Sequence, residues 1–233
     1  LLRIVFKTKN DFCMPVSGTG SAAMEACFVN LIEPGDSVTV CINGVFGERM
    51  SDIVVRSGGV LSRVEASWGK SLDMNAIRDN LLLNHPKILA VVHAETSTGV
   101  LTHLSQIKEV LNEFPETLLL VDCVTSLGGH SVGIDQFRVD FGYGGTQKCM
   151  SCPPGLAPIT VSDRAIKRIH SRKRKVQSWY LDLNMVENYW GNSRTYHHTA
   201  PISMNYALYE SLRIIHKEGL KQRWNRHHKN HLA

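Results

Sequence analysis

The sequence predicts an α/β fold, in which helices cover both faces of a mostly parallel central sheet. Strand-like and helix-like segments alternate regularly along the 233 residues. Two strand-like runs, ILAVVHAE at 88–95 and TLLLVDCV at 117–124, have uninterrupted apolar stretches, ILAVV and LLLV, which is typical of strands that are buried on both faces. The intervening segments have the length of crossover helices, about 10–14 residues. We therefore expect one α/β domain.

In the first half of the chain, helical spacing and breaker residues define the elements. Met24, Phe28 and Leu31 recur on one helical face. Asp73 is a candidate N-cap for the helix that Pro86 terminates. We expect strands at 12–17, 37–43, 60–66 and 88–95, and helices at 22–32, 48–58 and 74–85.

In the second half, Leu104, Ile107, Leu111 and Phe114 mark one face of a helix. We expect further strands at 117–124 and 157–162, and further helices near 163–171 and at 202–219. The chain begins at Leu1 inside an apolar stretch and stops in a helical, basic segment without a C-cap, so we expect a fragment or a processed chain.

Composition excludes several classes of protein. The 43% hydrophobic and 20% charged content is typical of a soluble globular protein and not of a disordered one. Its apolar runs are far shorter than the roughly 20 residues of a membrane span. A net charge of +5 is too small to indicate nucleic acid as the main partner. The six cysteines lie mostly in apolar segments, which predicts reduced thiols of an intracellular protein.

Three motifs follow predicted strands, where ligands bind in open α/β sheets. The first is SGTGSAAMEA at 17–26. Gly18 and Gly20 permit a tight turn, and Thr19, Ser21 and the amide groups of the next helix can bind an anion. The motif is neither G-x-G-x-x-G nor a Walker sequence, and an ordinary strand-to-helix turn is equally compatible with it.

The second motif is Asp122, at the end of the hydrophobic run LLLVD. A carboxylate in this position is costly unless a cation or a proton donor faces it. A metal ion, a histidine and a protonated ring nitrogen all qualify, and the residue could equally cap the following turn. A metal is less favoured, since only His93 and Glu95 are obvious companions; we expect no metal site.

The third motif is GGTQKCMSCPPG at 144–155, in which Lys148 follows Asp122 by 26 positions. Neighbouring glycines allow the amine to point inward, where loss of water would make it a nucleophile. A lysine is more often a solvated surface charge. Together, a strand-end carboxylate, an anion-binding loop and a loop lysine are the contacts that pyridoxal phosphate requires, and Phe46 could cover the ring.

The sequence closely resembles the class V (fold type I) aminotransferases, specifically the alanine–glyoxylate / serine–pyruvate group. The resemblance extends almost continuously from Val5 to His228 and is carried by SGTGSAAMEA, EPGDSV, NGVFGERM, ETSTGVL, LLLVDCVTSLGG, GGTQKCMSCPPG, SRKRK, NYWG and YHHT. It implies pyridoxal 5'-phosphate as cofactor and a three-layer large domain, with a mostly parallel sheet, over 1–215. Residues 216–233 would begin the linker to a C-terminal small domain that is largely missing.

The resemblance also implies roles for residues around the cofactor ring. Lys148 is expected to be the aldimine lysine and to move the proton between substrate and cofactor, and Asp122 to pair with the ring nitrogen. Val124 would pack beneath the ring. Phe46 would stack on it, where the family usually has Trp, and Thr96 would bond the ring hydroxyl, where the family usually has Ser.

Phosphate contacts are implied in the same way. The residues expected on the phosphate side are Thr19, Gly20, Ser21 and Gln147. At the position of Ser21 the family commonly has His. Tyr196 and Thr199 of the YHHT segment are similar to residues that reach the phosphate of the neighbouring subunit, so the resemblance implies a homodimer.

The activity implied is transamination between alanine or serine and glyoxylate or pyruvate, with ping-pong kinetics through an internal aldimine. It belongs to glyoxylate detoxification and glycine formation, and the family suggests a peroxisome or mitochondrion. Two alternatives stay open: a 3-hydroxykynurenine transaminase of the same family, and an inactive truncated subunit that only binds or dimerises. The second arises because the family's substrate-carboxylate arginine lies in the C-terminal domain. We expect no nucleic acid and no membrane as partners.

Two other clusters have simpler explanations. Cys149-x-x-Cys152 is more often incidental than redox-active or metal-binding when no second pair accompanies it. His227 and His231 would be neighbours on one helix face, but no carboxylate or cysteine joins them, so a polar helix face is favoured over a metal site.

Overall fold

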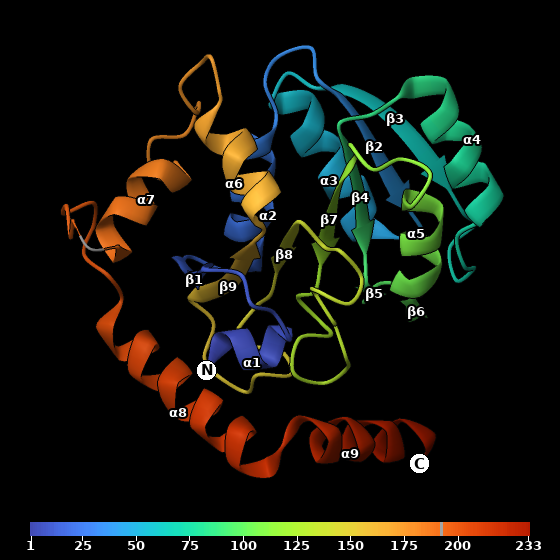
Figure 1. Cartoon of the computed structure of the whole chain (residues 1–233). Helices are drawn as coiled ribbons and strands as arrows, with labels where there is room; N and C mark the ends of the chain where they lie inside the picture. The colour runs from blue at the N-terminus through green and yellow to red at the C-terminus, as the bar shows by residue number, and fades with distance from the viewer. Residues whose placement is uncertain (192) are drawn as a thin grey trace.

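A seven-stranded sheet lies between two layers of helices in the computed structural model, which describes residues 1–191 and 193–233 (Figure 1). The strands of this sheet are β1 (Phe12–Ser17), β2 (Ser37–Ile42), β3 (Val60–Glu65), β4 (Ile88–Val92), β7 (Leu118–Asp122), β8 (Phe141–Tyr143) and β9 (Leu156–Val161). Their order is β1-β9-β8-β7-β4-β2-β3. Neighbours from β3 to β8 are parallel, and β9 is antiparallel to both β8 and β1. The prediction of a mostly parallel α/β sheet is confirmed.

Each face of the sheet has its own hydrophobic cluster. One face is covered by α2 (Gly20–Leu31), α3 (Val45–Arg56), α6 (Asp163–His170) and α7 (Leu183–Trp190). The other is covered by α1 (Leu2–Phe6), α4 (Met74–Asn84), α5 (Leu104–Leu111) and α8 (Ile202–Glu218), and α9 (Leu220–Leu232) follows α8 along the outside (Figure 1). Within the described residues, every helix is too short or too polar to cross a membrane.

Alternate side chains of the central strands belong to opposite clusters. In β7, Leu118 and Leu120 belong to one cluster, and Leu119 and Val121 belong to the other. All residues of β4 and β7 are buried. Successive side chains of a strand point to opposite faces, and here both faces are covered. This is why β4 and β7 contain no polar residue other than the final Asp122.

Several predicted boundaries are confirmed and others are wrong. Asp73 caps α4, with its side chain accepting from the Asn75 amide. The single strand expected over 88–95 is in fact two, because Ala94–Glu95 (β5) leaves the sheet and pairs with Val100–Leu101 (β6). Helix α7 was not predicted; its start is capped by Asp182.

The topology brings the sequence motifs to one edge of the sheet. Strands β1, β4, β7 and β8 all end there, since β9 alone reverses direction. Because β9 returns antiparallel beside β8, the connection between them needs no crossover helix. The loop that contains Lys148 therefore stays at the carboxyl edge, beside the loop that follows β1.

Candidate active site

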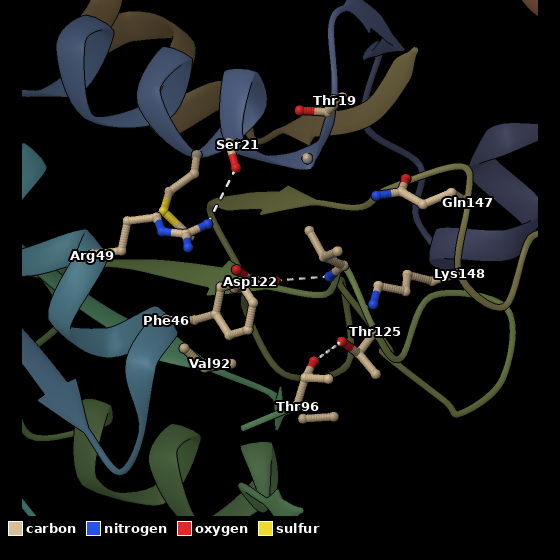
Figure 2. A pocket seen from close by; sticks show the side chains of 14 residues that line it. Thr19, Ser21, Phe46, Arg49, Val92, Thr96, Asp122, Thr125, Gln147 and Lys148 are labelled. Carbon is tan, nitrogen blue, oxygen red and sulfur yellow. Dashed lines mark hydrogen bonds between the residues drawn. The ribbon is translucent and has the colours of Figure 1, made fainter. Parts of the chain in front are cut away.

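A pocket opens at the carboxyl edge of the sheet and collects residues from five separate segments (Figure 2). It encloses about 630 Å³ of empty space, open solvent at its mouth included. Its lining residues are Thr19, Gly20, Ser21, Met24, Phe46, Arg49, Val92, Ala94, Thr96, Asp122, Val124, Thr125, Gln147 and Lys148. Every expected cofactor residue between Thr19 and Lys148 is in this set.

Asp122 is the buried acid of the pocket, with 4% of its surface exposed. Its Oδ1 accepts a hydrogen bond from the Val124 amide at 2.8 Å, and its Oδ2 accepts one from the Tyr143 hydroxyl at 2.9 Å. Burial raises the pKa of Asp122 to about 6, and Glu95 adds to this, while the two hydrogen bonds oppose it. Each carboxylate oxygen keeps a lone pair for a further donor.

The predicted anion loop lies on the opposite wall. Gly18 has φ 154°, and Thr19 is the N-cap of α2 but its side chain makes no capping hydrogen bond. The Ala22 amide donates to the Thr19 carbonyl at 2.8 Å, which leaves the amides of Gly20 and Ser21 at the helix start available to an anion. A Cβ on Gly20 would approach Val124 Cγ2 to 2.8 Å, so this close approach requires glycine.

Lys148 comes from the loop between β8 and β9 and its side chain extends into the pocket in Figure 2. Inside that loop, the Ser151 amide donates to the Lys148 carbonyl at 2.9 Å and the Cys152 amide to the Thr146 carbonyl at 2.9 Å. The expectation that the amine loses its water is wrong for this structure, because Lys148 is exposed. Gln147, the preceding residue, is exposed as well, so this wall of the pocket borders solvent.

A third wall is built on α3 and the β5–β6 segment. The half-buried Phe46 ring lies under the Arg49 guanidinium at 4.9 Å. The Phe46 amide donates to Glu95 Oε2 at 3.1 Å, so a buried carboxylate fixes the start of this helix. The Thr96 hydroxyl shares a 2.6 Å hydrogen bond with that of Thr125.

The lining residues Arg49 and Thr125, and Tyr143 as the hydrogen-bond partner of Asp122, could not be found from the sequence. Tyr143, Arg49 and Thr125 reach the site through register and helix position: Tyr143 is the direct neighbour of Asp122 across β7 and β8, and Arg49 stands one turn after Phe46. No local sequence signal marks such neighbours. Conversely, Tyr196 and Thr199 were expected at the cofactor but do not line this pocket. Both are exposed, and their hydroxyls are 3.1 Å apart.

The residues present fit the chemistry of pyridoxal phosphate. The cofactor brings a phosphate, a basic ring nitrogen, an aromatic face and an aldehyde. The pocket offers a helix N-terminus for the anion, a buried carboxylate with free lone pairs, the half-buried Phe46 ring, and the Lys148 amine. The glycine at position 20 leaves space at the helix start that a Cβ would fill.

Comparisons with known proteins agree with this fit. An alanine–glyoxylate aminotransferase from Callithrix jacchus is 38% identical over 229 residues, which are 97% of this chain and 55% of the relative. An (S)-ureidoglycine–glyoxylate transaminase from Bacillus subtilis (strain 168) is 38% identical over 251 residues, 100% of this chain and 60% of the relative. The chain thus spans less than two thirds of the length of these relatives.

Solved structures give the same result. The crystal structure of an alanine–glyoxylate aminotransferase from Nostoc sp. matches with a TM-score of 0.96 and 48% identity, over 98% of this chain and 60% of that one. The sequence pattern of the aminotransferase class-V family matches residues 5–232. Since that match covers nearly the whole chain, the chain belongs to the class-V aminotransferases, a family of the fold type I architecture that uses pyridoxal phosphate.

Proposed function

We propose that the protein is a pyridoxal phosphate-dependent aminotransferase that uses glyoxylate as amino acceptor. The observation that carries this proposal is that Asp122, Lys148 and the first turn of α2 line the same pocket. The printed names of the two relatives, from an animal and a bacterium, share glyoxylate and differ in the amino donor. We therefore assign the acceptor from the shared substrate.

The residues would hold the cofactor as follows. Amides of the first turn of α2, together with Thr19, Ser21 and Gln147, bind the phosphate. Phe46 and Val124 enclose the ring, and Thr96 bonds its hydroxyl. All of these residues line the same pocket, which supports the proposed roles.

Asp122 and Lys148 would carry the chemistry. When bound, pyridoxal phosphate supplies an aldehyde carbon that amines attack and a protonated ring that takes up electrons. Asp122 holds the proton on the ring nitrogen, because a cation against a buried carboxylate favours its ionised form. Nζ of Lys148 would be the amine that holds the aldehyde carbon, and it would also be the base that takes the proton from the donor's Cα.

For the donor, we propose alanine or serine, with ureidoglycine as a second candidate because of the Bacillus subtilis relative. Pyruvate is the alternative acceptor. A 3-hydroxykynurenine transaminase and an inactive dimerising subunit are the competing functions. Full-length protein assayed with glyoxylate and, in turn, with alanine, serine, ureidoglycine and 3-hydroxykynurenine distinguishes the transaminases. The 233-residue chain in the same assays tests the inactive subunit, which turns over none.

We propose a homodimer as the working unit. The exposed hydroxyls of Tyr196 and Thr199 lie outside the chain's own pocket, as expected of groups that serve a neighbour. The peroxisomal or mitochondrial location stays a prediction, and so does the division into a large domain over 1–215 and a linker from 216.

Borohydride reduction tests the central assignment directly. Full-length protein loaded with pyridoxal phosphate, reduced and digested, is expected to give one phosphopyridoxyl peptide, labelled at Lys148. The Lys148→Ala variant should give none and lose activity by at least about 10²-fold, the lower range for a lost general base. Label on any other lysine contradicts the proposal.

A further inference from the structure

The loop that carries Lys148 is fixed from outside by the last two helices. On α8, the Ser211 hydroxyl donates to the Met150 carbonyl, and the Ala207 carbonyl accepts from Cys152 Sγ at 3.5 Å. On α9, Arg223 Nη2 donates to the Cys149 carbonyl, directly after the lysine. Three contacts, made by Cys149, Met150 and Cys152, therefore dock this loop on helices that are far away in the sequence.

Arg223 is held firmly enough to act as a support. It is 5% exposed, and its Nη1 donates to Glu218 Oε2 at 2.7 Å. Glu218 accepts two further hydrogen bonds from Arg226, and these guanidinium contacts lower the pKa of Glu218 to about 2. The carboxylate consequently stays ionised at physiological pH and keeps the planar Arg223 fork oriented toward the loop.

The opposite side of Cys149 is also confined. Its thiol donates to the Thr125 carbonyl at 3.2 Å, in the turn that follows Asp122. A Cβ on Gly129 would lie 2.5 Å from Cys149 Sγ, so this turn packs tightly on the cysteine. Cys149 is therefore clamped between α9 and the turn after β7, and its neighbour Lys148 is held in register with Asp122.

The loop needs such support because its own conformation is not relaxed. Ser151 has φ 58°, a left-handed conformation that is unfavourable for a residue other than glycine. Arg223 Nη2 also lies 3.4 Å from the Ser151 hydroxyl. The guanidinium thus contacts both the residue after the lysine and the strained residue that closes the turn.

We propose that Arg223 is a positioning residue, which fixes the backbone of the lysine loop so that Nζ of Lys148 meets the reacting carbon. The proposal rests on the function assigned to Lys148. Arg223 does not line the pocket, so it acts only through the loop. Removing it should loosen residues 149–152 and slow the proton transfer by Lys148, while leaving substrate binding nearly unchanged.

The test compares Arg223→Ala with Arg226→Ala in the full-length protein. Arg226 binds the same carboxylate, but its side chain is 49% exposed and its hydrogen bonds go to Glu218, which makes it a matched control. Amide hydrogen exchange, measured without cofactor, should quicken at Ser151 and Cys152 by about tenfold or more in Arg223→Ala, as expected for the loss of one charge-assisted hydrogen bond. In Arg226→Ala the change should stay within about twofold.

The loaded enzyme gives a second measurement. In Arg223→Ala, kcat should fall about tenfold while KM for the amino donor changes by less than about twofold. If Arg223→Ala does not fold, Arg223→Lys decides: one ammonium group can keep the pair with Glu218 but cannot also reach the Cys149 carbonyl, so its loop amides should still exchange faster.

The outcomes distinguish a failure of the function proposed for Lys148 from a failure of the role proposed for Arg223. Wild-type protein that acquires no label on Lys148 removes the proposed function. Label on Lys148, with equal loop exchange and equal kcat in the Arg223 variants and Arg226→Ala, removes only the role of Arg223.

Discussion

Asp122 is a charged group in a place where charge is expensive. Burial on β7 raises its pKa from the usual 3.8 to about 6. The Val124 amide and the Tyr143 hydroxyl offset only part of the cost. A cationic ring nitrogen against the free lone pairs would offset the rest of the cost of burying the charge. Asp122 is therefore suited to a protonated partner.

The cofactor-free protein should therefore become more stable when Asp122 is replaced by Asn. The folded wild type binds a proton here between pH about 4 and about 6 that the unfolded chain has released, so its stability falls as pH rises through this window. Asn carries no charge and escapes that loss. The Asp122→Asn advantage should grow from near zero at pH 4 to at most about 3 kcal/mol above pH 7.

Urea unfolding of both proteins between pH 4 and 8 measures this difference. A gap that does not vary with pH would show that the charge of Asp122 is not its cause. The same variant, loaded with cofactor, should lose about 10²–10³-fold in kcat, the range for a lost electrostatic contact in a reaction centre.

At the scale of elements, the sequence predicted best what depends on local periodicity. Strands β4 and β7 were evident because both faces are covered, and the α4 cap because Asp73 acts on its own helix. The split at His93 was not evident: its amide donates to the Asp122 carbonyl and its carbonyl accepts from Thr102, contacts that depend on the tertiary arrangement. Tyr143 was missed for the same reason, since register pairs it with Asp122.

The start of α2 and the turn after β7 are fitted to each other, and a double substitution should reveal it. Gly20→Ala places a methyl group 2.8 Å from Val124 Cγ2 and 3.3 Å from Cγ1. We expect a loss of about 1–3 kcal/mol in the free energy of unfolding and weaker cofactor binding, as Val124 is pushed into the pocket. Adding Val124→Ala removes both clashing methyl groups and should recover part of the loss.

Four proteins close this cycle: wild type, each single variant and the double variant. Urea unfolding and pyridoxal phosphate titration should both give a favourable coupling of about 0.5–3 kcal/mol. Strictly additive losses would mean that the cost of Gly20→Ala does not come from its contact with Val124.

At the scale of the whole molecule, one reversed strand determines how the site is assembled. Because β9 runs against β8 and β1, the segments after β1 and β8 lie next to each other at the carboxyl edge, and the Gly18 amide donates to the Gly155 carbonyl at 3.0 Å. The anion loop and the lysine loop are thus directly bonded. Tyr196 is the exception, since this residue is 72% exposed and does not line the pocket.

If a second copy provides the pocket for Tyr196, two inactive variants should repair each other. In a mixed dimer of Lys148→Ala and Tyr196→Ala chains, one site combines an intact lysine with an intact tyrosine from the other chain, and the second site lacks both. Random assortment of equal amounts in a two-fold symmetric dimer then restores about a quarter of the wild-type sites. Unfolding and refolding the full-length variants together, followed by an alanine–glyoxylate assay at limiting cofactor, measures the recovery.

The control mixes wild type with a chain that carries both substitutions. Its mixed dimers also keep one lysine, but the other subunit lacks the tyrosine. In this control the wild-type homodimers alone supply about a quarter of the sites. If Tyr196 serves its own chain, the first mixture stays inactive, and each mixed dimer of the control gains one working site, which raises the control to about half of the wild-type sites.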